Sequence, residues 1–306
     1  MIKVRKQELL FLQKKKQKNS HYLRALAPRP PKPAGNKSFL LLFFKKEVLA
    51  FFLCFFPFAA HATNIAAVPI GRQNLPWWQA RFTTTLAEAK TTPNAKIIWL
   101  GDSITQFWQR TGPHGYDNIL PIWQKYYAPY NALDFGFVGD TTSSLLWRLD
   151  HGQVASLHPS LAIILIGANN LGHPHWPASL TTPGIEAVVT KTHTLLPTTH
   201  ILLLGVLPSI RSPWVDTQTK LINQSLAQAY ANNATVTFID VSPVLTTNGH
   251  ADPALYIDPK ETPPRPALHP DAAGMSRIAA YLAPTVQHFV SLPSVASRQS
   301  SEPSDN

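Results

Sequence analysis

The sequence predicts an α/β fold in which helices cover both faces of a five-stranded parallel sheet. Short apolar runs alternate with longer segments of helical periodicity from residue 96 onward. The runs lack the apolar and polar alternation of half-exposed strands, as expected for parallel strands buried on both faces. This alternation of strands and helices implies right-handed crossovers and a doubly wound sheet. The body is long enough for one domain of roughly 200 to 230 residues.

Each element follows from its own pattern. The predicted strands are rich in β-branched and aromatic residues and comprise Ile97 to Leu100, Ala132 to Val138, Leu161 to Ile166, Ile201 to Val206 and Val236 to Val241. The predicted helices lie near Ile104 to Arg110, Ser143 to Leu149, Gly184 to Leu195, Thr217 to Tyr230 and Asp271 to Val290. In such sheets ligands bind at the carboxyl ends of the strands. Functional side chains are therefore expected directly after the strands.

Residues 1–62 are expected to be a basic leader and a signal peptide. They hold 13 of the 27 Lys and Arg residues but only two of the 17 acids. A positive flank precedes the apolar run from Val48 to Phe58, and Ala60-His61-Ala62 is typical of a cleavage site. Cleavage is predicted after Ala62, with the mature protein periplasmic or secreted. A membrane anchor needs about 20 apolar residues, which this run reaches only by including three charges, so no stable span is expected after cleavage.

The charge of the remaining chain excludes several classes of function. Residues 63–306 hold 14 basic and 15 acidic residues, and the basic ones are scattered singly. Nucleic-acid binding needs clustered Lys and Arg, so no nucleic-acid partner is expected. Cys54 is the sole cysteine and lies in the leader, which leaves the mature chain without disulfide or thiol chemistry.

Two segments flank the predicted α/β domain, residues 96–290. Residues 63–95 are expected to form an N-terminal arm packed on the domain, with a helical stretch from Leu75 to Lys90. Its adjacent Trp77 and Trp78 are interpreted as packing residues, although a platform for stacking sugars is the alternative. The Ser-rich polar tail, residues 291–306, is expected to be disordered.

A serine follows the first predicted strand, in Gly101-Asp102-Ser103. A serine at a strand-to-helix turn presents its hydroxyl to solvent, and its backbone N–H lies near a helix N-terminus that favours a nearby anion. Ser and Asp are also ordinary N-cap residues. The position by itself therefore suggests a nucleophile without establishing one.

Donors for an oxyanion follow the second and third strands. Acyl transfer needs hydrogen-bond donors aimed at the oxygen that gains charge. The backbone N–H groups of Ser103 and Gly139 and the side-chain amide of Asn169 are candidates for this oxyanion hole, because each arises where a strand ends. A glycine turn or an asparagine cap is common by itself. The occurrence of all three candidates in order, each after a strand, is what indicates an oxyanion hole.

His269 precedes the last predicted helix and is the candidate general base for Ser103. The other histidines, including His173 and His175, lack a third or fourth ligand at metal spacing and are expected on a surface loop. No metal and no organic cofactor is expected. The turn at Asp102-Ser103 is not a Gly-rich phosphate cradle, which argues against a flavodoxin-like cofactor binder.

These blocks resemble the SGNH (GDSL) hydrolase family over about residues 75–290. Gly101-Asp102-Ser103 matches its nucleophile block, Gly139 and Asn169 its oxyanion blocks, and His269 its last block. The segments 135–142, 146–149 and 205–208 are similar to the catalytic subunits of platelet-activating-factor acetylhydrolase and their secreted bacterial relatives. The resemblance implies a three-layer flavodoxin-like fold and hydrolysis of an ester, commonly acetyl, without a metal or cofactor.

The chain departs from this family at the triad acid. The family usually places an Asp three residues before the His, where this chain has Pro266. Asp258 and a backbone carbonyl near Pro266 are the leading alternatives for orienting the imidazole, with Glu261 behind them. Asp271 is expected to serve the first turn of the last helix.

The predicted function is a secreted or periplasmic serine carboxylesterase or acetylesterase that works through an acyl-enzyme intermediate. Its substrate would be a small-molecule or polysaccharide acyl ester. The alternative is a non-catalytic carbohydrate-binding protein on the same fold, motivated by the displaced Asp and the two adjacent tryptophans. The sequence leaves open the natural substrate, the acyl chain length and the oligomeric state.

Overall fold

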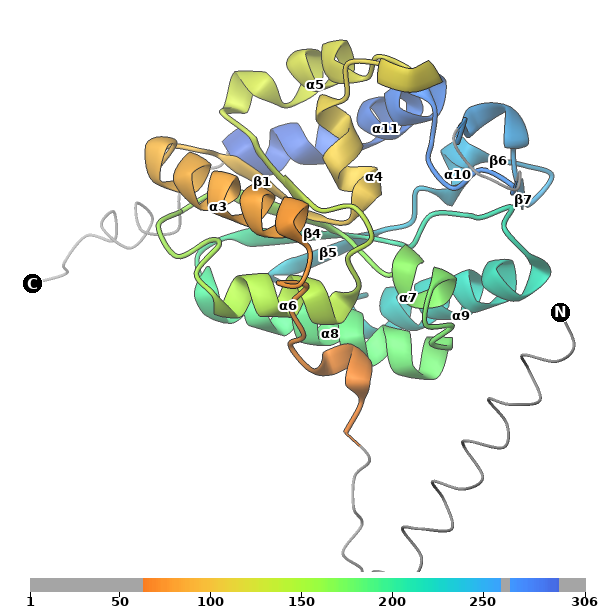
Figure 1. The fold of residues 1–306 in the computed structure, drawn as a ribbon, viewed down its shortest axis with the longest axis horizontal. Helices are drawn as coiled ribbons and strands as arrows, with labels where there is room; N and C mark the ends of the chain where they lie inside the picture. Colours follow the sequence, from red (N-terminus) through yellow and green to blue (C-terminus); the bar gives the residue numbers. More distant parts are fainter. Residues whose placement is uncertain (1–62, 260–264, 292–306) are drawn as a thin grey trace, which may run out of the picture. The chain divides into compact units, whose positions relative to one another are not determined.

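The computed structural model describes residues 63–259 and 265–291 of the 306-residue chain. A five-stranded sheet lies at its centre (Figure 1). Its strands are β1 (Ile97–Gly101), β2 (Leu133–Gly136), β3 (Leu161–Leu165), β4 (His200–Leu204) and β5 (Val236–Ile239). All neighbours are parallel, in the order β2-β1-β3-β4-β5. The predicted doubly wound sheet is confirmed, and the chain reverses direction across the sheet between β1 and β3, where such folds bind ligands.

Helices cover both faces of the sheet and make three layers (Figure 1). One face is packed by α4 (Ser103–Gln106), α5 (Leu120–Tyr126), α10 (Ser242–Leu245) and α11 (Ala272–Ser291). The other face is packed by α6 (Thr142–Asp150), α8 (Ala178–Leu195) and α9 (Pro213–Ala229). The flavodoxin-like three-layer arrangement implied by the resemblance is therefore confirmed.

Side chains of the central strands alternate between the two cores. In β1, Ile97 and Trp99 belong to the core beneath α11, whereas Ile98 and Leu100 belong to the core beneath α8. All four are fully buried. Each such aliphatic side chain contributes about 1.5 to 3 kcal/mol on burial. Burial on both faces explains why the strand sequences are continuously apolar.

Several boundaries differ from the predicted ones. The helix expected at 104–110 is split into α4 and the 3-10 helix η2 (Phe107–Gln109). The elements α5, α7 (Ala168–Gly172) and the hairpin of β6 (Thr246–Thr247) with β7 (His250–Ala251) were not predicted. They are too short to show a clear periodicity.

Helix α8 begins six residues before the predicted start at Gly184. Pro183 lies inside this helix, and a proline normally suggests a helix boundary because it lacks an N–H. Gly184 permits the N-terminal segment to lie close, since a Cβ atom there would be 2.7 Å from the carbonyl oxygen of Ala66. The helix therefore continues past Pro183, and its packing against the N-terminal segment stabilises it there.

The segment before the sheet contains the 3-10 helix η1 (Ile65–Ala67) and α3 (Pro76–Thr91). Its two adjacent tryptophans have different environments: Trp78 is fully buried, while Trp77 is 44% exposed. The Nε1 atom of Trp78 donates to Oδ1 of Asp140 at 2.7 Å. Packing on the domain therefore holds for Trp78 but not for Trp77.

The predicted signal peptide and the Ser-rich tail beyond Ser291 lie outside the described residues. Among the helices of residues 63–259 and 265–291, none is both long enough and apolar enough to cross a membrane.

Candidate active site

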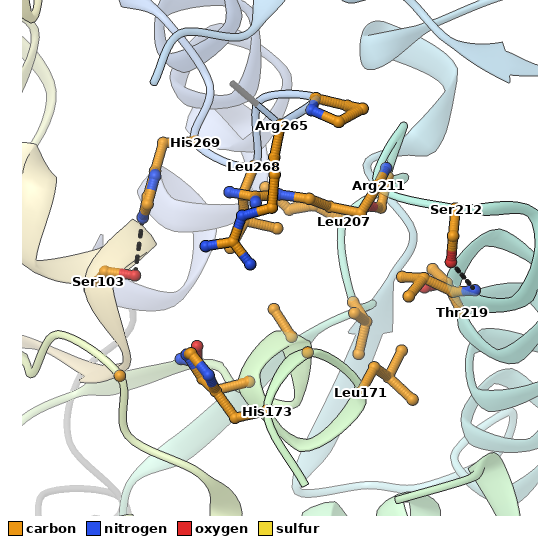
Figure 2. A pocket seen from close by; sticks show the side chains of 18 of the residues that line it. Ser103, Leu171, His173, Leu207, Arg211, Ser212, Thr219, Arg265, Leu268 and His269 are labelled. Carbon is orange, nitrogen blue, oxygen red and sulfur yellow. Dashed lines mark hydrogen bonds between the residues drawn. The ribbon is translucent and has the colours of Figure 1, made fainter. Parts of the chain in front are cut away.

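A cavity of about 440 Å³ opens at the carboxyl edge of the sheet (Figure 2). Ser103, Gly139, Asn169 and His269 all line it. They follow β1, β2, β3 and the last loop, and the outermost pair is 166 positions apart in the chain. The structure thus brings together the three residues expected at the strand ends and the histidine expected before the last helix.

Ser103 is the first residue of α4. Asp102 caps this helix by accepting a hydrogen bond from the N–H of Ile104 at 2.9 Å. The turn demands a glycine just before it, because a Cβ atom at Gly101 would lie 2.1 Å from Oγ1 of Thr105 and 2.3 Å from a carbonyl oxygen of β3. Close packing of α4 against β3 therefore fixes the position of the Ser103 hydroxyl.

Ser103, His269 and Asp258 form a continuous hydrogen-bond chain. The Nε2 atom of His269 lies 2.8 Å from Oγ of Ser103, and its Nδ1 atom lies 2.5 Å from Oδ1 of Asp258. A carboxylate can only accept, so Nδ1 carries the proton and Nε2 presents its lone pair to the serine hydroxyl. The ring of Phe107 stacks on the imidazole with centroids 4.4 Å apart and restricts its rotation.

The environment of Asp258 favours its ionised form. Its Oδ2 atom accepts from the N–H of Leu268 at 2.6 Å and from Nη2 of Arg211 at 3.1 Å. Burial opposes ionisation, but the hydrogen bond and charge of His269, the Leu268 N–H and Arg211 together lower the pKa of Asp258 below its ordinary value. The carboxylate is therefore charged under the imidazole.

A short antiparallel pairing carries Asp258 to His269. The N–H of Ile257 donates to the carbonyl of His269, and the N–H of Asp271 donates to the carbonyl of Leu255, both at 2.8 Å. Between them, Tyr256 and Pro270 form an isolated bridge. We call this pairing of residues 255–257 with 269–271 the clasp. It closes the loop on which Pro266 lies and sets Asp258 beside the imidazole.

Two of the three alternatives for the acid position lie within the described residues. Asp258 is the group at Nδ1 of His269, at 2.5 Å, which leaves no role there for a carbonyl near Pro266. Glu261 lies outside the described residues. Asp271 accepts from the N–H of Gly274 at 2.7 Å and thus serves the first turn of α11, as predicted.

The expected oxyanion donors lie on the wall beside Ser103. Gly139 has φ of +74°, a left-handed conformation that residues with a side chain rarely adopt. The amide of Asn169 donates one N–H to the carbonyl of Asp140 at 3.0 Å, which fixes its orientation and leaves its second N–H for a ligand. Residue Asp140 therefore connects the two loops that carry these donors.

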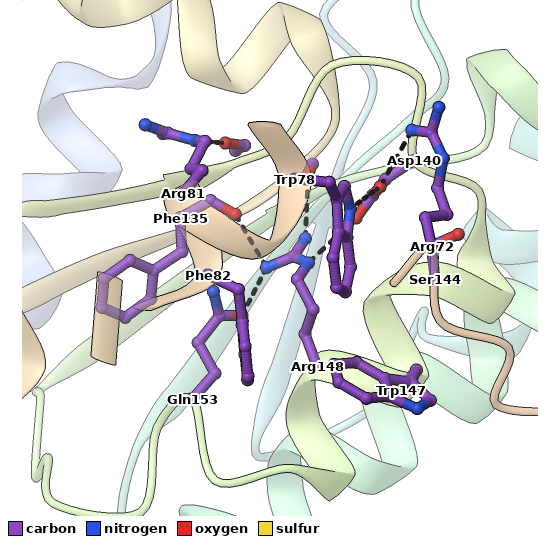
Figure 3. A network of polar contacts seen from close by, with 12 residues as sticks. Arg72, Trp78, Arg81, Phe82, Phe135, Asp140, Ser144, Trp147, Arg148 and Gln153 are labelled. Atoms are coloured by element: carbon purple, nitrogen blue, oxygen red, sulfur yellow. Dashed lines mark hydrogen bonds and ion pairs between the residues drawn. The ribbon is translucent and has the colours of Figure 1, made fainter. Parts of the chain in front are cut away.

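Beneath the site, a fully buried arginine ties the strand ends together (Figure 3). Arg148 donates from Nη2 to the carbonyl of Gly101 at 3.0 Å, from Nη1 to that of Phe135 at 3.1 Å, and from Nε to Oδ2 of Asp140 at 2.9 Å. Burial lowers the pKa of Arg148 to about 10, against the opposing effect of Asp140. The guanidinium therefore stays charged at neutral pH and pairs with a buried carboxylate.

The sequence did not identify four basic side chains in the cavity wall. Arg211, Arg265, His173 and His175 line the cavity. The two histidines lie on an exposed loop, as predicted, but this loop faces the cavity. The sequence showed the pattern His-Pro-His, but no local feature indicated that the side chains of these histidines would line the cavity. Across the described part of the chain, no group of three or more His, Cys, Asp or Glu residues is arranged to hold a metal.

Comparison with known proteins identifies the family. The model of the GDSL-like lipase/acylhydrolase family matches residues 99–277. The alpha1 subunit of platelet-activating factor acetylhydrolase IB from Bos taurus is 28% identical over 167 residues, covering 54% of this chain and 66% of the subunit. The alpha2 subunit from Rattus norvegicus is 30% identical over 183 residues, covering 58% of this chain and 74% of the subunit. The match therefore spans slightly less than two thirds of the bovine relative.

A solved structure has the same fold. A GDSL-like lipase from Bacteroides thetaiotaomicron superposes with a TM-score of 0.51 at 18% identity, covering 68% of this chain and 98% of that one. The family match at residues 99–277 includes both the serine after β1 and the histidine before α11. The chain belongs to the GDSL-like lipase/acylhydrolase family, a family of hydrolases that act on esters.

Proposed function

We propose that the protein is a secreted or periplasmic serine carboxylesterase that removes short acyl groups, above all acetyl, through an acyl-enzyme intermediate. The observation that carries this proposal is the hydrogen-bond chain from Ser103 through His269 to Asp258, at the edge of a cavity that Gly139 and Asn169 also line. The arrangement supplies a nucleophile, a base, an orienting acid and oxyanion donors.

In the first step, Oγ of Ser103 attacks the ester carbonyl carbon and its proton passes to Nε2 of His269. The carbonyl π electrons move onto oxygen, and this oxyanion accepts hydrogen bonds from the N–H groups of Ser103 and Gly139 and from Asn169. Asp258 remains ionised and stabilises the imidazolium that forms. Each oxyanion donor of this kind contributes about 3 to 4 kcal/mol to the transition state.

Collapse of the intermediate breaks the bond between the carbonyl carbon and the alcohol oxygen. His269 gives its proton to that oxygen, and the alcohol leaves. A water molecule then attacks the acyl-serine, with His269 again taking the proton, and the carboxylic acid departs as Ser103 recovers its hydrogen. One ester and one water thus yield one acid and one alcohol, with no cofactor.

Substrate class and location rest on separate observations. The name acetylhydrolase, carried by the curated relatives, supports acetyl as the acyl group. The basic, apolar leader with Ala60-His61-Ala62 supports export. The cavity of about 440 Å³ has room for a short acyl group and one sugar-sized alcohol part, which is consistent with a small-molecule or polysaccharide ester.

The predicted alternative, a non-catalytic carbohydrate-binding protein, rested on a missing triad acid and on two adjacent tryptophans. Asp258 occupies the acid position beside His269, and Trp78 is fully buried. Both observations favour the esterase.

Replacement of the nucleophile tests the mechanism. Ser103→Ala should abolish hydrolysis of p-nitrophenyl acetate and labelling by a fluorophosphonate probe, since the acyl-enzyme cannot form. Ser225→Ala, which removes an exposed hydroxyl of α9 that does not line the cavity, is the matched control and should keep both. Labelling of the Ser103→Ala variant at the parent rate would show that a different residue is the nucleophile.

A further inference from the structure

We propose that Tyr116 is a positioning residue of the catalytic triad, whose hydroxyl donates a hydrogen bond to Asp258 and thereby holds the carboxylate on the imidazole of His269. The inference deepens the proposed function and rests on it, because it assigns a role in the same proton transfers. Three observations lead to it: the place of the Tyr116 hydroxyl at the carboxylate, the packing of the Tyr116 ring, and the closure of the loop that carries it.

The two carboxylate oxygens of Asp258 have different partners. Oδ2 accepts from the N–H of Leu268 at 2.6 Å and from Nη2 of Arg211 at 3.1 Å. Oδ1, which lies 2.5 Å from Nδ1 of His269, also accepts from the hydroxyl of Tyr116 at 3.4 Å. Because an ionised carboxylate can only accept, the hydroxyl is the donor. Among the described residues, Tyr116 is thus the second donor at the oxygen that orients His269.

The environment of Tyr116 keeps its hydroxyl protonated. Burial and the charge of Asp258 raise the pKa of Tyr116, against the opposing effect of Arg110. The ordinary pKa of a tyrosine, about 10, already lies well above neutral pH. The hydroxyl therefore remains a hydrogen-bond donor throughout the pH range in which a histidine acts as a base.

The ring of Tyr116 is held by a cation and by a second ring. The guanidinium carbon of Arg110 lies 3.7 Å from the ring centroid of Tyr116 and 3.1 Å from that of Phe107. The centroids of the two rings are 5.7 Å apart, so the guanidinium packs against both. Phe107 in turn stacks on the imidazole of His269. One cluster therefore contacts the base through Phe107 and the acid through Tyr116.

The loop of residues 111–118, which carries the tyrosine, is closed on itself and fastened beside the clasp. An isolated antiparallel bridge between its first and last residues closes its base. Oδ2 of Asp117 accepts from the N–H of Ala272, at the start of α11, at 2.8 Å. A Cβ atom at Gly115 would lie 3.4 Å from Pro259. The loop is therefore fixed at two points next to the clasp, which determines where its tyrosine meets the triad acid.

Tyr116 acts on the reaction through Asp258. Neither Tyr116 nor Arg110 is among the residues that line the cavity, so a substrate in the cavity does not contact them. A donor at Oδ1 stabilises the ionised carboxylate and limits its movement away from Nδ1 of His269. Loss of this donor should slow the proton transfers of both acylation and deacylation, while substrate binding stays unchanged.

Tyr116→Phe tests the inference in the whole protein, since it removes the hydroxyl and keeps the ring that Arg110 contacts. With p-nitrophenyl acetate, kcat should fall by about three- to tenfold, as suits one long hydrogen bond, and KM should change by less than twofold. The rate at which a fluorophosphonate labels Ser103 should fall by a similar factor, because labelling needs attack by the Ser103 hydroxyl. Tyr281→Phe, at an exposed position of α11 outside the cavity wall, should match the parent.

A double-mutant cycle separates this role from a merely structural one. Asp258→Ala removes the acceptor altogether, whereas the amide oxygen of an asparagine could still accept from Tyr116. In the Asp258→Ala background, Tyr116→Phe should change kcat by less than twofold, since the hydroxyl has lost the group through which it acts. Thermal unfolding verifies that each variant is folded. An equal fold-loss in the parent and in the Asp258→Ala background would show that Tyr116 acts elsewhere and would overturn the inference.

Failure of the inference can be separated from failure of the proposed function. Hydrolysis that depends on Ser103 but is unchanged in Tyr116→Phe would overturn the role of Tyr116 and keep the esterase. Hydrolysis and labelling that are unaffected by Ser103→Ala would overturn the mechanism instead. A rise in KM without a fall in kcat would place Tyr116 in substrate binding and also overturn the inference.

Discussion

At the scale of single residues, the triad acid shows how a required contact can be made from an unexpected position in the chain. Asp258 stands 11 residues before His269, whereas the related family usually places its acid three residues before. The contact itself has the expected geometry and leaves the carboxylate buried, charged and bound by four groups, namely His269, the Leu268 N–H, Arg211 and the Tyr116 hydroxyl. The chemistry constrains where the carboxylate must be in space and allows freedom in how the chain reaches it.

Asp258→Asn should lower kcat by two to four orders of magnitude with little change in KM. The amide cannot stabilise the imidazolium and favours the wrong tautomer. Initial rates with p-nitrophenyl acetate measure the effect. Asp216→Asn, which alters a carboxylate on α9 that pairs with Lys220, is the control. A loss of less than twofold in Asp258→Asn would mean that another group orients His269.

The residues of the site differ in how far the sequence could predict them. Ser103, Gly139 and Asn169 each follow a strand directly, so the order of the elements was enough to bring them to one edge. Asp258 depends on the clasp, a pairing between segments with no sequence signature of their own. Arg265 depends on the course of the same loop. Contacts set by long-range backbone pairing cannot be read from local patterns.

At the scale of elements, the segment before the sheet supports the loop that carries Gly139. Arg72 donates from Nη1 to the carbonyl of Val138 at 2.6 Å and forms an ion pair with Asp140 at 3.3 Å. Trp78 binds the same carboxylate. Because Asp140 also orients Asn169 through its carbonyl, this segment supports both oxyanion loops.

Arg72→Ala should therefore lower kcat several-fold while changing KM little, since oxyanion donors act mainly on the transition state. Steady-state kinetics with a short acyl ester measures both constants. Lys90→Ala, a substitution at an exposed position of α3, should leave both at parent values. An Arg72→Ala variant with unchanged kcat would show that the loop keeps its conformation without this support.

The ends of β1 and β2 depend on Arg148 in a similar way. Arg148→Met should lower the free energy of unfolding by about 3 to 5 kcal/mol, because it leaves Asp140 buried beside fewer partners. Adding Asp140→Asn should recover part of that loss, because it removes the unpaired charge. Urea unfolding of the two single variants and the double variant measures the coupling. Strictly additive losses of unfolding free energy in the double variant would show that Arg148 and Asp140 are not directly coupled.

At the scale of the whole molecule, buried carboxylates set how stability changes with pH. Burial raises the pKa of Asp134 to about 7, against the opposing effects of Arg81 and the N–H of Gly136. Its pKa in the unfolded chain is about 3.9. A raised pKa in the folded state gives a contribution to stability that is complete below about pH 4 and is lost as pH rises through about 7.

Asp134→Asn removes this titration. Between pH 5 and pH 8 the parent should lose about 3 kcal/mol of unfolding free energy relative to Asp134→Asn. Urea unfolding at the two pH values gives the difference, and Asp216→Asn should follow the parent. A constant difference between the parent and Asp134→Asn would mean that Asp134 stays ionised throughout.

The five strands and their parallel, doubly wound sheet could be predicted because each strand is marked by an apolar run, which is a local pattern in the sequence. Each run in β1, β3 and β4 is continuous and bounded by polar residues. Helix starts were less certain, as at α8, where packing against Ala66 overrides the usual effect of Pro183. Local propensity fails where tertiary contacts supply the missing stabilisation.

The clasp has a consequence for how such enzymes diversify. It fixes both ends of the loop by backbone hydrogen bonds at Ile257 and Asp271, and these bonds do not depend on the side chains between them. Substitutions at Arg265 and Pro266, which lie on this loop and line the cavity, should therefore alter the substrate-facing wall while Ser103 and His269 keep their distance. Selection can act on what the enzyme recognises separately from the chemistry that it performs.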